Sequence, residues 1–346
     1  MNPPRLRLAL LGCGEITRTQ HLPAALVHPE IEVVALVDAD EPRARSLARD
    51  FQISCRSAGD CKSVLPDCDA VINALPNALH AAATLELLHA GKHVLCEKPL
   101  ATTSADARAC SELAARRDLV LAVGMNRRFD STQGLLHCVL RGRQLGDLVS
   151  YDWQYGGEFE WHSASGFYFN RSLAGGGVLM DFGVHLLDAL VNWFGPVTTM
   201  DYQDDDWGSG VEANCILHLQ HQGKYGPIAG RVQMSRTVTL PNRLLVRGSA
   251  ADAEVRVGVP DAMFLYREIG GEKMVETIRL AQEPGKSSFH KQLDNFVESI
   301  RGHQSPVIDG EQAVQVLELI EWCYGHRQRI PEPWSEIAPA MSSAGA

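Results

Sequence analysis

The first third of the chain alternates short apolar runs with segments of helical periodicity. The apolar runs, which we interpret as strands, lie at residues 5–11, Ile31–Val37, Ala70–Leu75, His93–Cys96 and Leu119–Val123. The segments with helical periodicity lie at Glu41–Phe51, Asn77–Ala90 and Ser104–Arg117. Strands that alternate with helices predict a parallel sheet with right-handed crossovers. We therefore expect an α/β domain with a doubly wound parallel sheet over residues 1–125, and a ligand beyond the carboxyl ends of its strands.

The pattern changes after Asn126, where strands follow one another with few helices between them. The segments that we interpret as strands are Leu148–Tyr155, Glu212–Leu219, Ile228–Ser235, Arg243–Arg247 and Ala253–Val259. Runs of strands without intervening helices are typical of a mostly antiparallel, open sheet. Helical segments follow at Ser288–Arg301 and Gly310–Gln328. We therefore expect an α+β domain over residues 126–330 and a loosely ordered tail over residues 331–346.

One long helix interrupts these strands, and it carries residues suited to acid–base chemistry. It follows the glycine-rich turn Gly175–Gly177 and places Asp181 and His185 on one face, four residues apart. Asp188 continues this polar stripe on an otherwise apolar helix, which is typical of a cleft lining. A carboxylate one turn from a histidine can orient the ring and stabilise its charged form. The alternative is a structural ion pair or a hydrogen-bonded core histidine.

A second glycine-rich turn lies between the first two predicted strands. The first apolar run ends at Gly12-Cys13-Gly14, a helical segment follows, and the next strand ends in Asp38. This order is typical of a dinucleotide-binding unit, in which glycines let backbone amides approach a pyrophosphate and the acid binds the ribose hydroxyls. Thr17 occupies the position of the third glycine of that motif. The alternative is a glycine turn in another kind of α/β protein.

Length and composition limit the classes of function. A chain of 346 residues exceeds what one hydrophobic core normally serves, which agrees with two domains. A formal charge of −10 argues against a nucleic-acid partner, since phosphate binding needs clustered lysine and arginine. The 9 cysteines are scattered without a Cys-x-x-Cys pair, which indicates the reducing cytoplasm. No segment approaches the ~20 apolar residues of a membrane-spanning helix, so we expect no membrane partner.

Taken together, the motifs resemble those of the Gfo/Idh/MocA oxidoreductase family, named for glucose–fructose oxidoreductase and inositol dehydrogenase. The matching motifs, in order along essentially the whole chain, are Gly12-Cys13-Gly14 with Asp38, Leu75-Pro76-Asn77 with His80, Glu97-Lys98-Pro99, Gly175 to Asp188 with Asp181 and His185, and Asp309-Gly310 before Ala313. The set is specific, although each motif alone is not. Thr17 is a departure from the pattern, and it bears on the nucleotide site.

The resemblance implies a nicotinamide-dependent enzyme and a role for each motif. Lys98 lies beside the nicotinamide and donates a hydrogen bond to the substrate oxygen, while His185 removes or supplies the hydroxyl proton. Asp181 holds the His185 ring or contacts a neighbouring hydroxyl, so we expect Asp181→Asn to lower turnover less than His185→Ala or Lys98→Met. The bond before Pro99 is often cis in this family. The cofactor-binding residues implied are Gly12, Gly14, Glu15, Ile16, Asp38, Leu75, Pro76, Asn77, His80, Glu97 and Lys98.

Charge predicts which cofactor is bound. A carboxylate at the end of the second strand accepts the ribose hydroxyls of NAD and repels the extra phosphate of NADP. Asp38 therefore favours NAD over NADP. Arg43 and Arg45 could reach such a phosphate, but on a helix that leaves the sheet they are more often solvated.

The substrate contacts are less well defined. The candidates are Asn126, Arg127 and Arg128, which follow the last strand of the first domain, and Trp161 and Tyr168, which lie in the aromatic segment Gly156–Ala174. Aromatic faces stack on sugar rings, but rings at this position could equally pack the domain junction. We interpret the acidic cluster Asp201, Asp204, Asp205 and Asp206 as a solvated hairpin. Because no His/Cys spacing indicates zinc, we expect no metal site.

The preferred function is an NAD(P)-dependent oxidoreductase that acts on a secondary alcohol or ketone of a sugar, cyclitol or sugar derivative. The alternative is a catalytically silent regulator of the same fold that senses nucleotide and sugar, against which Lys98, Asp181 and His185 argue. A third hypothesis is a redox-assisted glycosidase, which in this family lacks the Glu-Lys-Pro motif present here. An open sheet with few helices also predicts self-association, to a homodimer or homotetramer.

Overall fold

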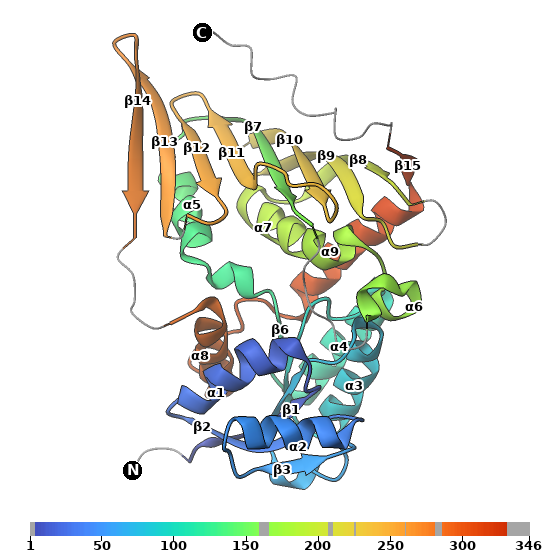
Figure 1. The fold of residues 1–346 in the computed structure, drawn as a ribbon. Helices are drawn as coiled ribbons and strands as arrows, with labels where there is room; N and C mark the ends of the chain where they lie inside the picture. Colours follow the sequence, from blue (N-terminus) through green and yellow to red (C-terminus); the bar gives the residue numbers. More distant parts are fainter. Residues whose placement is uncertain are drawn as a thin grey trace.

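The structure is a computed structural model, and it describes residues 4–158, 166–206, 210–224, 226–259, 261–280 and 286–330. The chain forms a six-stranded sheet near one end of the molecule and a nine-stranded sheet near the other (Figure 1). Helices fill the space between the two sheets. The predicted tail at residues 331–346 lies outside the described residues.

The first sheet is parallel throughout and has the order β3-β2-β1-β4-β5-β6. Its strands are β1 Leu6–Leu11, β2 Ile31–Val37, β3 Arg56–Ala58, β4 Ala70–Asn73, β5 His93–Cys96 and β6 Leu121–Val123. Its helices are α1 Leu22–Val27, α2 Glu41–Asp50, α3 Asn77–His89 and α4 Ser104–Arg117. The predicted α/β class is confirmed, and only the short, half-polar strand β3 was not anticipated.

Alternate residues of β1 face opposite sides of this sheet, as the two-residue period of a strand requires. Leu8 and Leu10 share a core with α1 and α2, whereas Ala9 and Leu11 share a core with α3 and α4. The first of these cores also contains Phe296 of α8 (Ser288–Ile300). A helix from the last part of the chain therefore completes one face of the first sheet, so residues 126–330 do not all pack on the second sheet.

The second sheet has the order β14-β13-β12-β11-β7-β10-β9-β8-β15 and is mostly antiparallel, as predicted. Among the described strands of this sheet, the pairs that run parallel are β10 with β7 and β15 with β8. The strands are β7 Leu148–Gly156, β8 Val197–Asp204, β9 Asn214–Gly223, β10 Gly226–Ser235, β11 Arg243–Gly248, β12 Asp252–Arg256, β13 Ala262–Ile269, β14 Glu272–Arg279 and β15 Gln328–Arg329. The sequence patterns did not anticipate β8, β13, β14 and β15.

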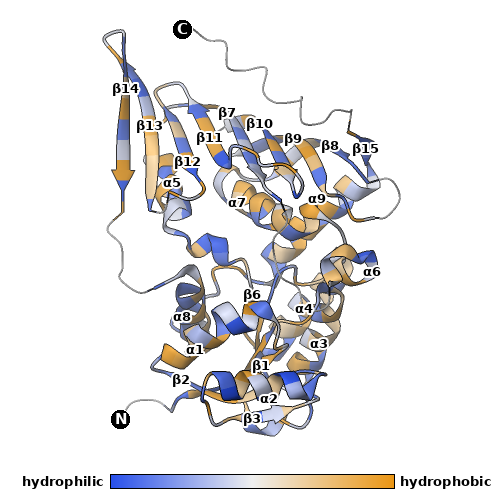
Figure 2. Ribbon diagram, viewed as in Figure 1, coloured by the Kyte–Doolittle hydropathy of each residue, from blue (hydrophilic) through white to orange (hydrophobic). Residues whose placement is uncertain are grey.

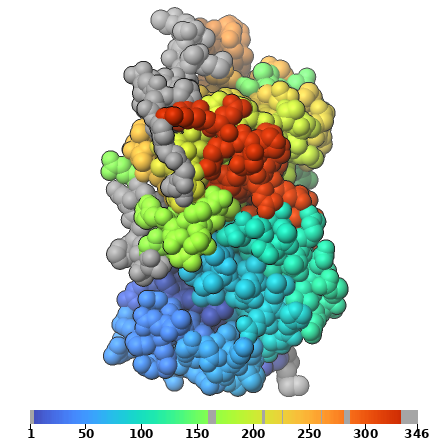
Figure 3. All heavy atoms as spheres, turned by 90° about the vertical axis from the view of Figure 1, so that its right-hand side faces the viewer, coloured from blue at the N-terminus to red at the C-terminus, as the bar shows by residue number. Residues whose placement is uncertain are grey.

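The face of the second sheet that looks toward the first sheet is covered by three helices, α5 Ser131–Arg141, α7 Val184–Phe194 and α9 Gly310–Gly325 (Figure 1). Hydropathy is high along α7, which lies in the middle of this layer (Figure 2). The helix α9 also packs against α4 of the first sheet, and Figure 3 shows the two in contact on one side of the molecule. The two sheets are therefore joined by shared helices.

The stretch Arg171–Phe194 runs through the short helix α6 (Arg171–Ala174) and the π-helical turn η5 (Leu179–Gly183) into α7. By length and composition alone it could span a membrane, which corrects the expectation that no segment comes near this length. Its most apolar window is 83% buried within the protein, against the second sheet and α9. The apolar character of this stretch is thus accounted for by packing inside the molecule.

Candidate active site

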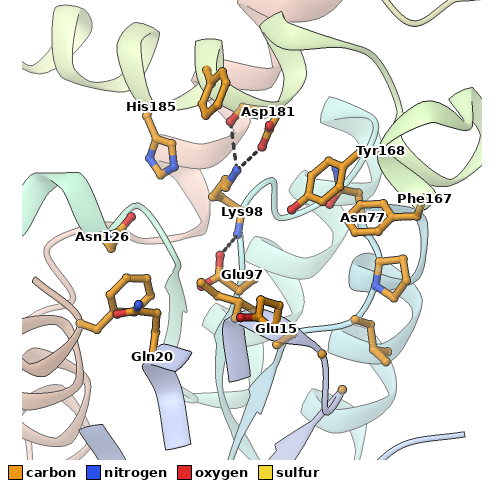
Figure 4. Close-up of a pocket in the computed structure, with 18 of the residues that line it drawn as sticks. Glu15, Gln20, Asn77, Glu97, Lys98, Asn126, Phe167, Tyr168, Asp181 and His185 are labelled. Atoms are coloured by element: carbon orange, nitrogen blue, oxygen red, sulfur yellow. Dashed lines mark hydrogen bonds and ion pairs between the residues drawn. The ribbon is translucent and has the colours of Figure 1, made fainter. Parts of the chain in front are cut away.

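A cavity of about 890 Å³ lies where the carboxyl ends of the first sheet face η5 and α7. The predicted site residues that line it are Gly12, Gly14, Glu15, Ile16, Asp38, Leu75, Pro76, Asn77, His80, Glu97, Lys98, Asn126, Arg127, Tyr168, Asp181 and His185. Trp161 lies outside the described residues. Motifs that are far apart in the sequence therefore meet in one cleft (Figure 4).

The turn Gly12-Cys13-Gly14 packs directly against the backbone that follows β4. Gly12 has φ +95°, and a Cβ atom there would lie 2.5 Å from the Ala74 carbonyl oxygen, so the turn requires glycine. A Cβ atom on Gly14 would meet nothing within 4 Å, which leaves open space on the cleft side of the turn. Thr17 is fully buried, and its Oγ1 donates to the Gly12 carbonyl at 2.6 Å. This hydrogen bond explains how a threonine is accommodated at the position of the third glycine.

Asp38 directly follows β2, and its carboxylate already has partners within the protein. Its carboxylate accepts hydrogen bonds from the backbone amides of Cys13 and Asp40, each at 2.9 Å. The Arg43 guanidinium lies 3.1 Å from the same carboxylate and lines the same cleft. Arg43 is therefore an ion-pair partner of Asp38 that also stays exposed to solvent, whereas Arg45 pairs with Glu41 at the exposed surface.

Glu97 and His80 make hydrogen bonds that stabilise the base of the cleft. Glu97 Oε1 lies 2.7 Å from His21 Nε2, and its Oε2 accepts from the Lys98 amide at 3.1 Å. Burial opposes ionisation of Glu97, but His21 and Lys98 outweigh it and lower the pKa of this carboxyl. Both ring nitrogens of His80 lie 2.6 Å from carbonyl oxygens, those of Leu75 and Pro99. His80 thus connects the loop that contains Leu75 to the loop that contains Pro99, and its ring also borders the cavity. The peptide bond between Lys98 and Pro99 is cis.

Lys98 and Asp181 form an ion pair at the centre of the cleft, in which Asp181 is buried and Lys98 is partly exposed (Figure 4). The Lys98 ammonium donates to Asp181 Oδ1 at 2.7 Å and to the Asp181 carbonyl at 3.0 Å. The other carboxylate oxygen, Oδ2, accepts from Arg236 at 2.8 Å. Burial raises the pKa of Asp181, but the two cations outweigh it and lower the pKa overall. Since an ammonium has three hydrogens, Lys98 keeps one for a ligand.

His185 lies beside this pair without being bonded to it. Within the described part of the chain its ring makes no hydrogen bond, and Nδ1 is buried. Burial and the charges of Lys98 and Arg127 hold the pKa of His185 well below its ordinary value of 6.5, so the ring is neutral at neutral pH. The expectation that Asp181 orients this ring and stabilises its charge is wrong, because both Asp181 oxygens are occupied by cations.

Asp188 does not continue the cleft lining as predicted. It is 4% exposed and forms an ion pair with Arg128, whose Nε lies 2.7 Å from Oδ2. The structural interpretation is therefore the right one for this residue. The acidic cluster is not a solvated hairpin either, since Asp204 is 1% exposed and both Asp204 and Asp206 pair with Arg327. Among the described residues, no group of three or more His, Cys, Asp or Glu side chains could hold a metal.

The start of the helical stretch that carries Asp181 and His185 is fixed by Glu212, which no sequence pattern pointed to. The Glu212 carboxylate accepts from the amides of Gly177 at 3.0 Å and Leu179 at 2.9 Å, and from the Tyr324 hydroxyl at 3.0 Å. A Cβ atom on Gly177 would lie 1.9 Å from the Glu212 carbonyl oxygen. The glycine turn therefore lets the helix approach the strand β9 region closely enough to be held there, and it sets where Asp181 and His185 stand.

The remaining candidate residues lie on opposite sides of the cleft. Arg127 donates to the Tyr155 hydroxyl at 2.8 Å and lies over that ring, and Asn126 donates to Ser288 Oγ at 3.2 Å. Tyr168 stands on the other side, above Asn77 (Figure 4). Burial and the Asp181 charge raise the pKa of Tyr168. The cleft thus offers both cationic and aromatic groups around the Lys98 ammonium.

Comparison with known proteins gives matches over most of the chain. Residues 6–125 match the family model "Oxidoreductase family, NAD-binding Rossmann fold", and residues 136–254 match the model "GFO/IDH/MocA C-terminal domain". The chain is 30% identical to a dTDP-3,4-didehydro-2,6-dideoxy-alpha-D-glucose 3-reductase of Saccharopolyspora spinosa, over 91% of this chain and 96% of the relative. It is 27% identical to the 1,5-anhydro-D-fructose reductase of Ensifer adhaerens, over 89% and 92%. The fold is similar to the crystal structure of the aldose-aldose oxidoreductase from Caulobacter crescentus, with a TM-score of 0.80, 25% identity, and coverage of 93% and 97%.

Proposed function

Because the chain belongs to the Gfo/Idh/MocA family of oxidoreductases, we propose that it transfers a hydride between a nicotinamide cofactor and a secondary alcohol or ketone of a sugar, cyclitol or sugar derivative. The observation that carries this proposal is the Lys98–Asp181 pair beside an unbonded, neutral His185 in one cleft. Two relatives, the 3-reductase and the anhydrofructose reductase, bear names that specify sugar substrates, which supports a carbohydrate here.

A dinucleotide fits the first half of the cleft. Gly14 leaves the backbone of the turn bare on its open side, and Asp38 follows the next strand, β2. The phosphates of the dinucleotide would contact the backbone from Gly12 to Ile16. Its riboses would contact Asp38 and Glu97, and its reactive end would contact Lys98. Leu75, Pro76, Asn77 and His80 would flank it on the α3 side. When bound, the nicotinamide supplies the carbon that gives or takes the hydride.

The chain's own residues then handle the proton and the charge on oxygen. The third hydrogen of the Lys98 ammonium would bond the reacting oxygen and stabilise negative charge that develops there. The neutral His185 ring would take the hydroxyl proton on oxidation, or return it on reduction. Asn126, Arg127 and Tyr168 would contact the rest of the substrate.

The nicotinamide absorbance at micromolar protein, with NAD or NADP and a panel of sugars and polyols, tests the proposal. Lys98→Met and His185→Ala should keep the nucleotide affinity and lower turnover by roughly two or more decades, the usual scale for loss of an acid–base group. A protein that binds nucleotide and sugar but turns over none of the panel would instead support the silent-regulator alternative.

We also propose NAD as the preferred cofactor, because the Asp38 carboxylate stands where the ribose hydroxyls would bind. Arg43 beside it is the feature that could favour NADP. Asp38→Ser should relax the preference for NAD by on the order of 1–3 kcal/mol, since a charge-assisted hydrogen bond and a repulsion are both lost. Arg43→Ala serves as the control with the opposite sign: it should weaken NADP more than NAD.

For assembly, we propose a homodimer or homotetramer formed through the second sheet, because its described helices all lie on one face. Light scattering that gives a monomer at micromolar concentration would refute this. We propose a cytoplasmic location with no nucleic-acid or membrane partner, which is supported by nine free cysteines and a charge of −10.

A further inference from the structure

Arg236 joins the site from a part of the chain where no motif pointed to function. It directly follows β10, and its side chain is only 4% exposed. Its guanidinium holds Asp181 Oδ2 at 2.8 Å while Lys98 holds Oδ1 at 2.7 Å. The Asp181 carboxylate is thus a bridge between two cations, one that borders the cavity and one behind it.

The backbone that carries Arg236 is held on both sides. The Arg236 amide donates to the Ala213 carbonyl at 2.8 Å. The hydroxyls of the flanking residues Ser235 and Thr237 both donate to Asn214 Oδ1, at 2.7 and 2.9 Å. The amide of Val238 also donates to Ser235 Oγ, at 2.8 Å. A side chain on a backbone fixed in this way can impose a position on its partner.

We propose that Arg236 is a positioning residue, which locks one oxygen of Asp181 so that the other oxygen and the Asp181 carbonyl aim the Lys98 ammonium at the reacting oxygen of the substrate. This inference rests on the proposed function. Arg236 does not border the cavity, so it acts through Asp181 and not by touching the substrate. Without Arg236, the carboxylate has only Lys98 as a partner and is free to turn.

Because of the charges around Asp181, the proposal also predicts how the pH dependence of turnover should change. The titratable and charged groups that face it are Lys98 from the loop after β5, Arg236 after β10, Tyr168 from the turn Phe167–Phe169, and His185 one helical turn away. Burial raises the pKa of Asp181, and Lys98 and Arg236 together bring it down. Without Arg236, only Lys98 counteracts the effect of burial on the pKa of Asp181. Asp181 should then become protonated at a higher pH and lose its ion pair with Lys98 at that pH.

The test compares Arg236→Met and Arg236→Lys with the wild-type enzyme and with a control on the same strand. The control is Arg231→Met, which removes an Arg–Asp pair of 2.8 Å with Asp152 that does not border the cavity. Arg236→Met should lower kcat roughly ten- to hundredfold, the scale of a misplaced catalytic group, with the NAD dissociation constant unchanged. The acid limb of its pH profile should move to higher pH. Arg236→Lys should restore that limb and part of kcat, and Arg231→Met should change neither.

Two results would overturn the inference. One is an Arg236→Met enzyme with wild-type kcat and an unmoved acid limb. The other needs no activity: a crystal structure of Arg236→Met in which Lys98 Nζ still stands 2.7 Å from Asp181 Oδ1. Failure of the proposed function is distinct from both, because it would be seen as a wild-type protein without turnover.

Discussion

Gly177→Ala is the sharpest single test of how the fold positions the site. The added methyl would lie 1.9 Å from the Glu212 carbonyl oxygen and 2.4 Å from its amide nitrogen. These are backbone atoms of the neighbouring segment, so no side chain can swing away to make room. The turn must move instead, and the two hydrogen bonds from Gly177 and Leu179 to the Glu212 carboxylate stretch with it.

The magnitude follows from these contacts. Overpacking of a tight site costs about 1–3 kcal/mol, and each hydrogen bond to a charged group contributes about 1.5–3 kcal/mol when intact. Since the turn can relax in part, we expect the free energy of unfolding to fall by about 2–4 kcal/mol, which for a chain of 346 residues lowers Tm by roughly 3–6 °C. A shift of about 1 Å in the helix that carries Asp181 and His185 should also lower turnover by up to about a hundredfold.

The assay is a thermal melt with and without NAD, followed by turnover of the folded fraction. Gly134→Ala is the matched control, because Gly134 is an exposed residue inside α5 where a Cβ atom meets nothing within 4 Å. In Gly134→Ala the free energy of unfolding should rise by about 0.5–1 kcal/mol, whereas in Gly177→Ala it should fall. If Gly177→Ala melts and turns over like the wild type, then close approach at Glu212 does not position the helix.

Three further outcomes follow from the contacts. Asp181→Asn leaves Lys98 and Arg236 without their shared counter-charge, so unfolding in urea should show a loss of about 3–5 kcal/mol, and turnover should fall at least as far as in Lys98→Met, which reverses the order expected from the motifs alone. His185→Gln should flatten the decline of stability between about pH 7 and 5, because a buried histidine with a lowered pKa resists the proton that the unfolded chain takes up near 6.5. Thr17→Val removes the donor to the Gly12 carbonyl and should lower stability by about 1–3 kcal/mol, read from the same urea curves.

The sequence predicted the elements whose signal is local. The parallel strands β1, β2, β4 and β5 are buried on both faces and therefore appear as plain apolar runs. By contrast, β14 is exposed along almost its whole length, and its charged and apolar residues do not alternate regularly, so it carries no buried face to detect. The strand β8 was missed because its end, Asp204, was taken for solvated surface, whereas Arg327 neutralises it in the core.

The candidate site shows the same difference between residues with a local sequence signal and residues without one. Residues on motifs, such as Lys98 and His185, could be named because their spacing is short and typical of a family. Glu212 and Arg236 could not, since they contact Gly177 and Asp181 from 35 and 55 residues away and belong to no local pattern. The wrong pairing of Asp181 with His185 has the same origin, because helical spacing shows which side chains share a face but not which distant cation competes for one of them.

Under the proposed function, that competition has a chemical consequence for Lys98 and His185, the two groups that would act on the reacting oxygen. If Asp181 were paired with His185, it would favour the charged ring and leave a proton where a base is needed. Paired with Lys98 and Arg236, it instead holds an ammonium as a hydrogen-bond donor, while burial and the same ammonium keep His185 neutral. Two neighbouring groups are thus kept in opposite protonation states by their surroundings, which is how a donor and a base can act on one oxygen at the same pH.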